Sequence, residues 1–261
     1  MPYVIAICHQ KGGVAKTTTA ISLGACFVER QHETLMVDLD PQANLTAGVG
    51  LNPSEMRRSA ADVLLGNDTL LRVSRETNVP GLDVVPSNVD MLMVAQHLHL
   101  RVPYEYILRD ALSKPELAHY DIVVLDCPTS LGPLTINALT AANLAVIPTQ
   151  CEYFSMQGLS GILKLINVVR SKTNPKLVYR LLVTMFDQRG SLHTRALAQI
   201  QQHFSGSLLE TLIGVDAKLR ESQLAGRPIT VHAPNSRGAQ QYRQLAEELL
   251  VYVQGQVFQT T

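Results

Sequence analysis

The first thirty residues place a loop rich in glycine and lysine between an apolar run and a helical pattern. The apolar run is Tyr3 to Cys8 (YVIAIC), residues 11–18 read KGGVAKTT, and helical spacing follows over Thr17 to Arg30. An apolar, partly β-branched run that stops at a polar segment with glycine is typical of a strand buried on both faces of a parallel sheet. The sequence therefore predicts a buried strand that leads through a tight loop into a helix.

This loop has the chemistry of a phosphate site. The general pattern is GxxxxGK[ST] between a strand and a helix, and here Gln10 and Ala15 occupy its two glycine positions. The groups that bind phosphate are still present despite both changes. Backbone N–H groups at a helix N-terminus bind anions, Lys16 supplies positive charge for the β- and γ-phosphates, and Thr17 offers a hydroxyl to Mg²⁺. Ala15 costs nothing in a right-handed conformation and about 1 kcal/mol if its φ is positive.

Two acidic segments follow other predicted strands. Ile122 to Asp126 is a buried strand that ends in an acid, and an acid at the tip of a strand beside the phosphate loop is the usual way to hold Mg²⁺. In Asp38-Leu39-Asp40, alternation along a continuing strand puts both carboxylates on one side, and Pro41 stops the strand. We expect one carboxylate of this pair to support the metal and the other to orient the attacking water. With the loop, these segments predict a nucleotide hydrolase.

Apolar runs alternate with helical spacing along the chain. The predicted strands are Tyr3 to Cys8, Thr34 to Val37, Leu82 to Val85, Ile122 to Leu125, Leu144 to Ile147 and Leu177 to Thr184, with Leu208 to Ile213 as a further candidate. The predicted helices are Thr17 to Arg30, Asp90 to Leu100, Tyr104 to Leu112, Leu134 to Ala142, Met156 to Val169, Thr194 to Phe204 and Gly238 to Val253. This alternation implies right-handed βαβ crossovers and a doubly wound, mostly parallel α/β sheet with helices on both faces.

The domain organisation follows from what the chain lacks. It has no internal repeat, no low-complexity tract and no linker rich enough in Gly, Ser or Pro to divide it, so we expect residues 1–261 to form a single domain. The stretch Asn44 to Asn88 carries turn signals and one short helical candidate, Ala60 to Leu65. We interpret this stretch as an excursion at the ligand-binding edge of the sheet.

Composition excludes several other classes of protein. Apolar residues make up 46% of the chain, which is too many for disorder, yet no apolar run reaches the ~20 residues needed to cross a bilayer. The N-terminus lacks the features of a signal peptide, so a cytoplasmic location is expected. Four cysteines stand singly, which argues against a disulfide scaffold and a zinc ribbon; they are Cys8, Cys26, Cys127 and Cys151.

The net charge of zero hides an asymmetry. Residues 1–159 contain ten Lys/Arg and sixteen Asp/Glu, a balance of −6, whereas residues 160–243 contain twelve Lys/Arg and four acids, a balance of +8. A basic C-terminal half on a neutral protein suggests a surface for an anionic partner. Ordinary solvated helix faces explain the same count equally well.

Several motifs together resemble the ParA/MinD group of deviant Walker-A ATPases, and within it the ParA (Soj-like) branch. The similarity extends from about Val4 to the final helix, and several motifs occur in order at the spacing of the family. The matching segments are KGGVAKTTTA, VDLDPQAN, DIVVLDCPTSLGPLTINALTAAN and PTQCEYFSMQGLSGI. The resemblance implies a P-loop NTPase fold, with ATP and Mg²⁺ as cofactors.

The resemblance also implies a role for each matched residue. Lys11 is similar to the signature lysine that reaches across a dimer interface to the partner's ATP, Lys16 to the phosphate-loop lysine, and Asp40 to the switch acid required for hydrolysis. These three are the expected catalytic residues. Thr17, Asp40 and Asp126 are expected at the metal, Asp126 as the Walker-B acid. The residues expected to bind the nucleotide are Lys11, Gly12, Gly13, Val14, Ala15, Lys16, Thr17, Thr18, Asp126 and Arg237.

The chain departs from the family pattern at a few positions. Ala15 stands for the usual glycine and Thr129 for a proline. We expect nucleotide binding to persist. The rate of hydrolysis is expected to be more sensitive, because a small displacement of the loop lysine slows the chemical step severely. The segment Ser236 to Gly238 resembles the loop that flanks the base, and Gly214 stands where relatives often have proline. Glu152 resembles an acid near the dimer interface, with a structural role as an equal alternative.

The resemblance implies a switch that dimerises on ATP and binds double-stranded DNA without sequence preference. Positions that match Arg189 and Lys218 lie in a basic DNA-binding surface in ParA relatives, while a solvated helix face is the preferred interpretation of Arg220. Hydrolysis is expected to be slow and stimulated by a ParB-like partner. The expected role is to segregate or position a chromosome, a plasmid or a protein cargo, with the protein associated with the nucleoid.

Three other classes share parts of these features. A MinD-like membrane-associated positioning ATPase has the same ATP site but needs a basic amphipathic C-terminal helix, and the tail after Arg243 has two acids and no base. The tail is therefore expected to be a core helix, with no membrane contact. A nitrogenase-iron-protein relative needs cluster cysteines, for which Cys127 and Cys151 are a possible pair. A metabolic P-loop kinase leaves Lys11 without a role.

Overall fold

The computed structural model describes the backbone of residues 1–151 and 155–257 and the side chains of residues 1–151 and 158–255. These residues form a seven-stranded sheet in the order β3-β4-β2-β5-β1-β6-β7. Neighbouring strands are parallel except for β3 and β4, which pair antiparallel. The strands are β1 (Tyr3–Ile7), β2 (Thr34–Asp38), β3 (Arg75–Glu76), β4 (Leu82–Val85), β5 (Ile122–Asp126), β6 (Leu144–Gln150) and β7 (Val178–Thr184). The predicted doubly wound, mostly parallel sheet is confirmed.

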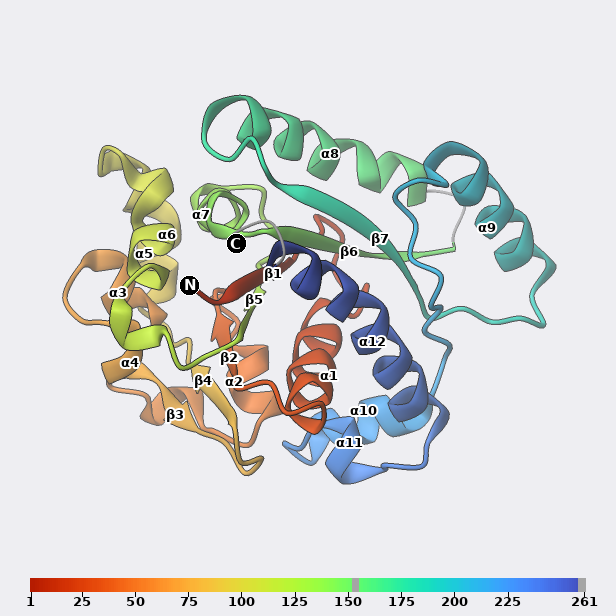
Figure 1. The fold of residues 1–261 in the computed structure, drawn as a ribbon, viewed down its shortest axis with the longest axis horizontal. Coiled ribbons are helices and arrows are strands. Elements are labelled where there is room, and N and C mark those ends of the chain that lie inside the picture. Colours follow the sequence, from red (N-terminus) through yellow and green to blue (C-terminus); the bar gives the residue numbers. More distant parts are fainter. Residues whose placement is uncertain (152–154, 258–261) are drawn as a thin grey trace.

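Helices cover both faces of this sheet (Figure 1). The α-helices are α1 (Lys16–Glu29), α2 (Asn44–Gly48), α3 (Ala60–Leu65), α4 (Leu70–Val73), α5 (Met91–His97), α6 (Ile107–Leu112), α7 (Pro133–Ala141), α8 (Ser155–Lys172), α9 (Ser191–Phe204), α10 (Ala217–Leu224), α11 (Ile229–His232) and α12 (Arg237–Val257). Short 3₁₀ helices are Pro53–Glu55, Leu98–Leu100, Tyr104–Tyr106 and Pro115–Leu117.

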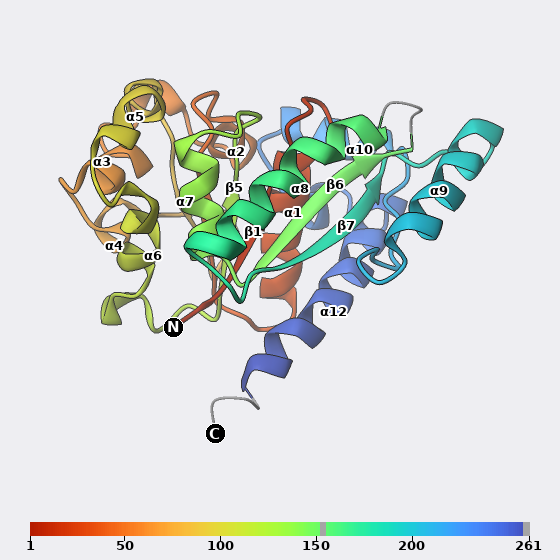
Figure 2. The same ribbon diagram turned by 90° about the horizontal axis from the view of Figure 1, so that it is seen from above.

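The two faces of the sheet enclose two apolar clusters, and β1 supplies both by strict alternation. Val4 and Ala6 belong to the cluster under α7 and α8, while Ile5 and Ile7 belong to the cluster under α1 and α12. Figure 2 shows α7 and α8 on one side of the strands and α1 and α12 on the other. A strand that feeds two cores has to be apolar at every position, which is why YVIAIC carries no polar residue before the loop.

The order of the strands places the phosphate loop at the centre of the sheet. The chain runs from β1 to β2 and β4 on one side and later to β6 and β7 on the other. Open α/β sheets bind ligands where the strand order reverses in this way. In register, Ile7 pairs with Asp126, and Asp126 pairs with Asp38. The carboxyl ends of β1, β5 and β2 therefore meet beside the loop.

The structure differs from the sequence-based expectation in several segments, of which three bear on the site. The candidate strand Leu208 to Ile213 is not a strand of the sheet; isolated bridges join Leu208 to Leu181 of β7 and Gly214 to Phe186, just after β7. The helix α10 was not predicted. In the excursion between residues 44 and 88, α2 lines the cavity described below, whereas α3 packs against α4, α5 and α6. The short helix predicted from Ala60 to Leu65 is confirmed as α3.

Candidate phosphate-binding site

The loop between β1 and α1 adopts two left-handed backbone conformations. Gly13 has φ +74°, and Ala15, which caps α1, has φ 67° and ψ 33°. Glycine enters this region freely, whereas an L-residue with a Cβ pays about 1–2 kcal/mol. Ala15 therefore has the positive φ for which the sequence predicts an energetic cost. Its methyl group stands where the backbone favours glycine.

Replacing Ala15 with glycine is expected to raise the free energy of unfolding by about 1 kcal/mol, because relief of the left-handed strain outweighs the extra freedom of the unfolded chain. Urea denaturation followed by circular dichroism measures the change. Ala20, in the interior of α1, provides the matched control, since Ala20→Gly is expected to lower stability by about 1 kcal/mol. If both substitutions destabilise the protein alike, Ala15 does not hold a left-handed conformation.

The positive charge at the loop comes from a buried lysine. The Lys16 side chain is 7% exposed, and its Nζ donates to the Lys11 carbonyl oxygen at 3.3 Å. The Nδ1 atom of His9 accepts the Lys11 backbone N–H at 2.7 Å, so His9 fixes the entry to the loop. Burial, and then the charges of Lys16 and Lys11, lower the pKa of His9 to about 4. This histidine is neutral at pH 7, and the lysines alone carry the charge.

Thr17 and Asp126 form the candidate metal site. The Thr17 hydroxyl donates to Asp126 Oδ2 at 2.7 Å. The other oxygen, Oδ1, is buried and has no hydrogen-bond partner in the part of the chain that the structure describes. Burial, and then the charge of Asp38, raise the pKa of Asp126 well above its ordinary value. A buried carboxylate oxygen without a partner, beside a hydroxyl on the phosphate loop, fits a hard divalent cation.

Protein groups alone do not enclose a metal here. Among the described residues, no cluster of three or more His, Cys, Asp or Glu side chains gathers at one point. This sparse donor set suits Mg²⁺, which keeps several waters and is held by one or two protein groups plus phosphate oxygens. The residues present therefore fit Mg²⁺ bound together with a phosphate ligand.

Asp38 and Asp40, which the sequence places on one side of a continuing strand, make different contacts. Asp38 is fully buried, and its Oδ2 accepts the backbone N–H and the hydroxyl of Thr46 at 2.9 and 2.7 Å. Burial raises the pKa of Asp38 to about 6. Asp40 is half-buried, lines the cavity described below and accepts the Gln42 N–H at 2.9 Å. Asp38 thus anchors α2 through Thr46, whereas Asp40, just before the turn at Pro41 and Gln42, lies on the cavity wall.

Lys11 lies at the rim of the loop and is exposed. Its Nζ donates to Gln150 Oε1 at 3.0 Å, and Gln150 Nε2 in turn donates to the Gly13 carbonyl oxygen at 3.0 Å. Gly12 and Gly13 line the adjacent cavity, whereas Lys11 is outside its lining. Gln150, at the end of β6, therefore tethers the lysine to its own chain, a contact that the sequence did not predict.

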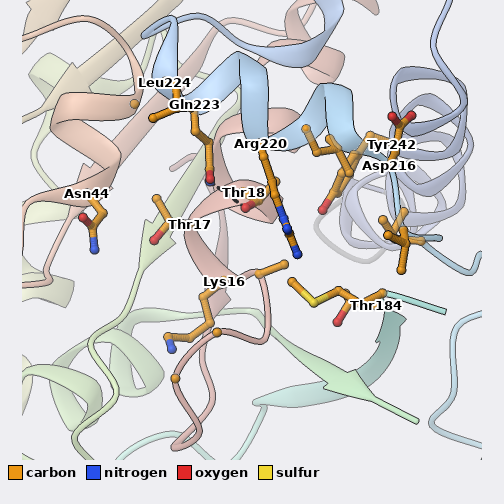
Figure 3. Close-up of a pocket in the computed structure, with 18 of the residues that line it drawn as sticks. Lys16, Thr17, Thr18, Asn44, Thr184, Asp216, Arg220, Gln223, Leu224 and Tyr242 are labelled. Atoms are coloured by element: carbon orange, nitrogen blue, oxygen red, sulfur yellow. Dashed lines mark hydrogen bonds between the residues drawn. The ribbon is translucent and has the colours of Figure 1, made fainter. Parts of the chain in front are cut away.

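A cavity of about 750 Å³ opens from the loop toward α10 and α12 (Figure 3). At the loop its lining includes Ala15, Lys16, Thr17 and Thr18. At the other end it is lined by apolar side chains and bare backbone, namely Met185, Ile213, Gly214, Val215, Leu219 and Tyr242. A pocket with a cationic end and an apolar end suits a phosphorylated ligand that carries an apolar or aromatic group. Val14 and Asp126 are buried behind this lining.

Two arginines lie differently from the sequence-based expectation. Arg237 is not part of the cavity lining; it packs behind Gly214, and its guanidinium donates to the Val215 carbonyl oxygen. It therefore supports the wall of the cavity from outside. Arg220, interpreted as a solvated side chain, is exposed and in addition lines the cavity, which the sequence did not predict. A sequence signal for α10, the helix that carries Arg220, was available in Asp216. Asp216 caps α10 by accepting the Lys218 N–H at 2.9 Å and so marks the start of a helix.

The two predicted DNA-contacting residues are exposed, and each pairs with an acid of its own chain. Arg189, 90% exposed, donates to both oxygens of Asp187 at 3.0 and 3.1 Å. These hydrogen bonds lower the pKa of Asp187 to about 2. Lys218 Nζ lies 2.7 Å from Glu221 Oε2, one turn along α10. The local positive charge is therefore smaller than the count of basic residues suggests.

The remaining residues of interest bear on the other classes. Cys127 and Cys151 are buried, as are Cys8 and Cys26. The last helix, α12, packs against α1 through fully buried Tyr242, Leu245, Ala246 and Leu249, as expected for a core helix. Glu152 lies outside the described residues. In the part of the chain that the structure describes, no helix has the length and apolar character needed to cross a bilayer.

Comparison with known proteins matches residues 3–179 to the model of an AAA-domain family, AAA_31. The sporulation initiation inhibitor protein Soj of Bacillus subtilis is 37% identical over 250 residues, which cover 95% of this chain and 98% of Soj. The chromosome partitioning protein ParA of Caulobacter vibrioides is 36% identical over 249 residues, 95% of this chain and 93% of ParA.

Solved structures agree with the fold. A cobyrinic acid a,c-diamide synthase from Mycobacterium smegmatis with bound ADP and magnesium superposes with a TM-score of 0.84 at 35% identity, covering 96% of this chain and 94% of that one. The septum site-determining protein MinD from Pyrococcus horikoshii, complexed with Mg-ADP, gives a TM-score of 0.76 at 24% identity, with coverage of 95% and 96%. At that identity the likeness to MinD concerns the fold alone.

Proposed function

The chain belongs to the ParA/MinD family of P-loop ATPases, with Soj and ParA among its relatives, and from this membership we propose that it is an ATP-driven switch. In the ATP state two copies dimerise and bind duplex DNA without sequence preference. A ParB-like partner stimulates slow hydrolysis, which resets the switch. The observation that carries this proposal is the pair of lysines on one loop, Lys16 buried beneath the cavity and Lys11 exposed at its rim.

The nucleotide that we propose for the cavity is Mg·ATP. Lys16 and the loop N–H groups would bind its phosphates, and Thr17 and Asp126 would hold Mg²⁺, which supplies charge neutralisation for the leaving phosphate. Asp40, the half-buried acid on the cavity wall, would orient the attacking water and assist the metal. The M. smegmatis structures with ADP or an ATP analogue and magnesium support this choice of ligand.

The position of Lys11 supports the proposed dimer. The cavity of its own chain is lined by Gly12 and Gly13 but not by Lys11. The lysine would therefore contact a nucleotide when a second copy presents an ATP-filled loop to it. An exposed hydrogen bond to Gln150 costs about 1 kcal/mol or less to exchange for a charge-assisted bond to phosphate. ATP then favours the dimer by the difference in affinity of the two states for the ligand. All of residues 1–261 are proposed to form one domain of this switch.

We propose that Arg189 and Lys218 contact DNA phosphates, with Asp187 and Glu221 as their internal competitors. Relatives named for chromosome partitioning support this assignment. The contacts are electrostatic, so binding is expected to weaken steeply as salt rises. A protein that uses such contacts is expected to associate with the nucleoid.

Charge changes at these pairs test the DNA surface. In the ATP state, Arg189→Glu is expected to weaken binding to a random duplex and to reduce the salt slope by about one for each phosphate that the protein no longer neutralises, whereas Glu221→Gln is expected to strengthen binding by releasing Lys218. Fluorescence anisotropy across a salt series measures both. Arg57→Glu, exposed before α3 near the opposite edge of the sheet, is the control. Equal affinity of Arg189→Glu, Glu221→Gln and wild type would exclude this surface.

The M. smegmatis relative is named as a diamide synthase, which makes ATP-dependent amide formation a second candidate. Such a reaction needs a second substrate beside ATP and gives Lys11 no role at a facing nucleotide. Incubation with Mg·ATP, cobyrinic acid and an ammonia source separates the two. Amide product without ATP-dependent DNA binding would favour the synthase; phosphate release with no amide would favour the switch.

A further inference from the structure

Arg220 extends from α10 into the cavity. Figure 3 shows its side chain crossing from the helix toward the loop that carries Lys16, beside Thr18. Among the described residues no hydrogen bond or ion pair with this guanidinium is found, although most other arginines of the chain have such a partner. Glu221, the next residue along the chain, pairs with Lys218 at 2.7 Å. Asp216, one turn earlier, is engaged elsewhere, since its oxygens accept the Lys218 and Gly238 N–H groups at 2.9 and 2.8 Å.

The backbone beneath Arg220 is held in place on several sides. Gln223 Nε2 donates to Thr18 Oγ1 at 2.6 Å, which ties α10 to the first turn of α1. Leu219 is buried in the cluster under α12, and Gly226, just after the helix, packs on the backbone of Gly50. The guanidinium therefore projects from a fixed helix, and little ordering of the backbone is needed when a ligand arrives.

The chemistry of the cavity indicates which part of a ligand this guanidinium meets. The phosphate end already has Lys16, the loop N–H groups and the candidate Mg²⁺ site. The end near α10 has Met185, Leu219 and the bare backbone at Gly214, which form an apolar slot. A guanidinium is planar, weakly hydrated and stacks on aromatic rings, whereas a lysine ammonium does not provide a flat face.

We propose that Arg220 is a base-binding residue, whose guanidinium stacks on the face of the nucleotide base. This inference rests on the proposed function, because it requires that the ligand is a nucleotide. Arg220 then acts in its own chain and adds affinity for ATP and ADP alike, independently of the γ-phosphate and of Lys11 from a second copy.

Competition binding with and without the base tests this role. The probes are the Mg²⁺ complexes of a non-hydrolysable ATP analogue, ADP and ribose 5′-triphosphate, which has no base. Arg220→Ala is expected to weaken the analogue and ADP by about tenfold each and to leave ribose 5′-triphosphate unchanged. Arg220→Lys is expected to behave as Arg220→Ala. Arg227→Ala, three residues after α10 and outside the cavity lining, is the control for a lost surface charge.

The outcomes separate this proposal from the proposed function. If wild type binds none of the nucleotides, the proposed function fails first. If wild type binds them and Arg220→Ala binds them equally well, the stacking role is overturned while the switch stands. If ribose 5′-triphosphate weakens as much as the analogue, or if lysine restores affinity, Arg220 contacts phosphate and the base assignment is wrong. Thermal unfolding of each variant verifies that the fold is intact.

Discussion

Replacing Lys16 with alanine is expected to weaken binding of a Mg²⁺-bound ATP analogue about a hundredfold or more. The side chain is 7% exposed and lies beneath the phosphate end of the cavity, so its loss removes a buried, charge-assisted contact to phosphate. Truncating one partner of such a contact costs about 2–5 kcal/mol. Isothermal titration calorimetry measures the change in Kd.

The control for this substitution is Lys176→Ala, an exposed lysine between α8 and β7, for which no change in Kd is expected. Lys16→Ala is expected to remain folded, because among the described residues the hydrogen bond of its Nζ is a long one, at 3.3 Å to the Lys11 carbonyl oxygen. A folded Lys16→Ala protein with wild-type affinity would show that the cavity does not use the loop to bind phosphate.

Asp40→Ala is expected to lower the rate of ATP hydrolysis by about a hundredfold or more while the Kd for the ATP analogue changes only a few-fold. Asp40 lines the cavity, and its side chain accepts the neighbouring Gln42 N–H at 2.9 Å. A carboxylate that positions water acts mainly in the transition state, and general-base effects of this kind contribute about 10²–10⁴ in rate. Phosphate release under single-turnover conditions measures the loss.

Glu55→Ala provides a comparison for this rate, since Glu55 is an exposed acid outside the cavity lining and hydrogen bonds to Asn52 at 2.8 Å. Its rate is expected to equal that of wild type. If Asp40→Ala also hydrolyses ATP at the wild-type rate, the water-positioning role belongs to another residue, and the assignment of the acid after β2 has to be revised.

The central part of the fold could be predicted because one constraint, burial of the strands on both faces, determines its residues. A strand such as β1 or β5 is buried on both faces, so its whole run is apolar, and the polar residues that follow are those that reach the ligand. The pairing of Ile7 with Asp126 and of Asp126 with Asp38 then brings the predicted acids to the loop. The order of the strands in the sheet and their burial together determine the position of the acids beside the loop.

Other features of the site depend on tertiary contacts that no local sequence pattern indicates. The helix α10 has only Leu219 and Ser222 buried, while Leu224 is 91% exposed, so apolar periodicity is absent and Arg220 could not be placed in the cavity. The conformation of Ala15 depends on how the loop closes onto α1. The contrast between Asp38 and Asp40 depends on Thr46, eight residues after Asp38, whose N–H and hydroxyl bind the first acid.

Sedimentation velocity with and without a Mg²⁺-bound, non-hydrolysable ATP analogue tests the central claim most directly, with Lys11→Ala as the matched variant. Wild type is expected to sediment as a monomer without nucleotide and as a dimer with the analogue. Lys11→Ala is expected to bind the analogue and remain a monomer, because the variant lacks the side chain that would contact the nucleotide of the second copy. A wild-type protein saturated with the analogue that stays monomeric would contradict the account.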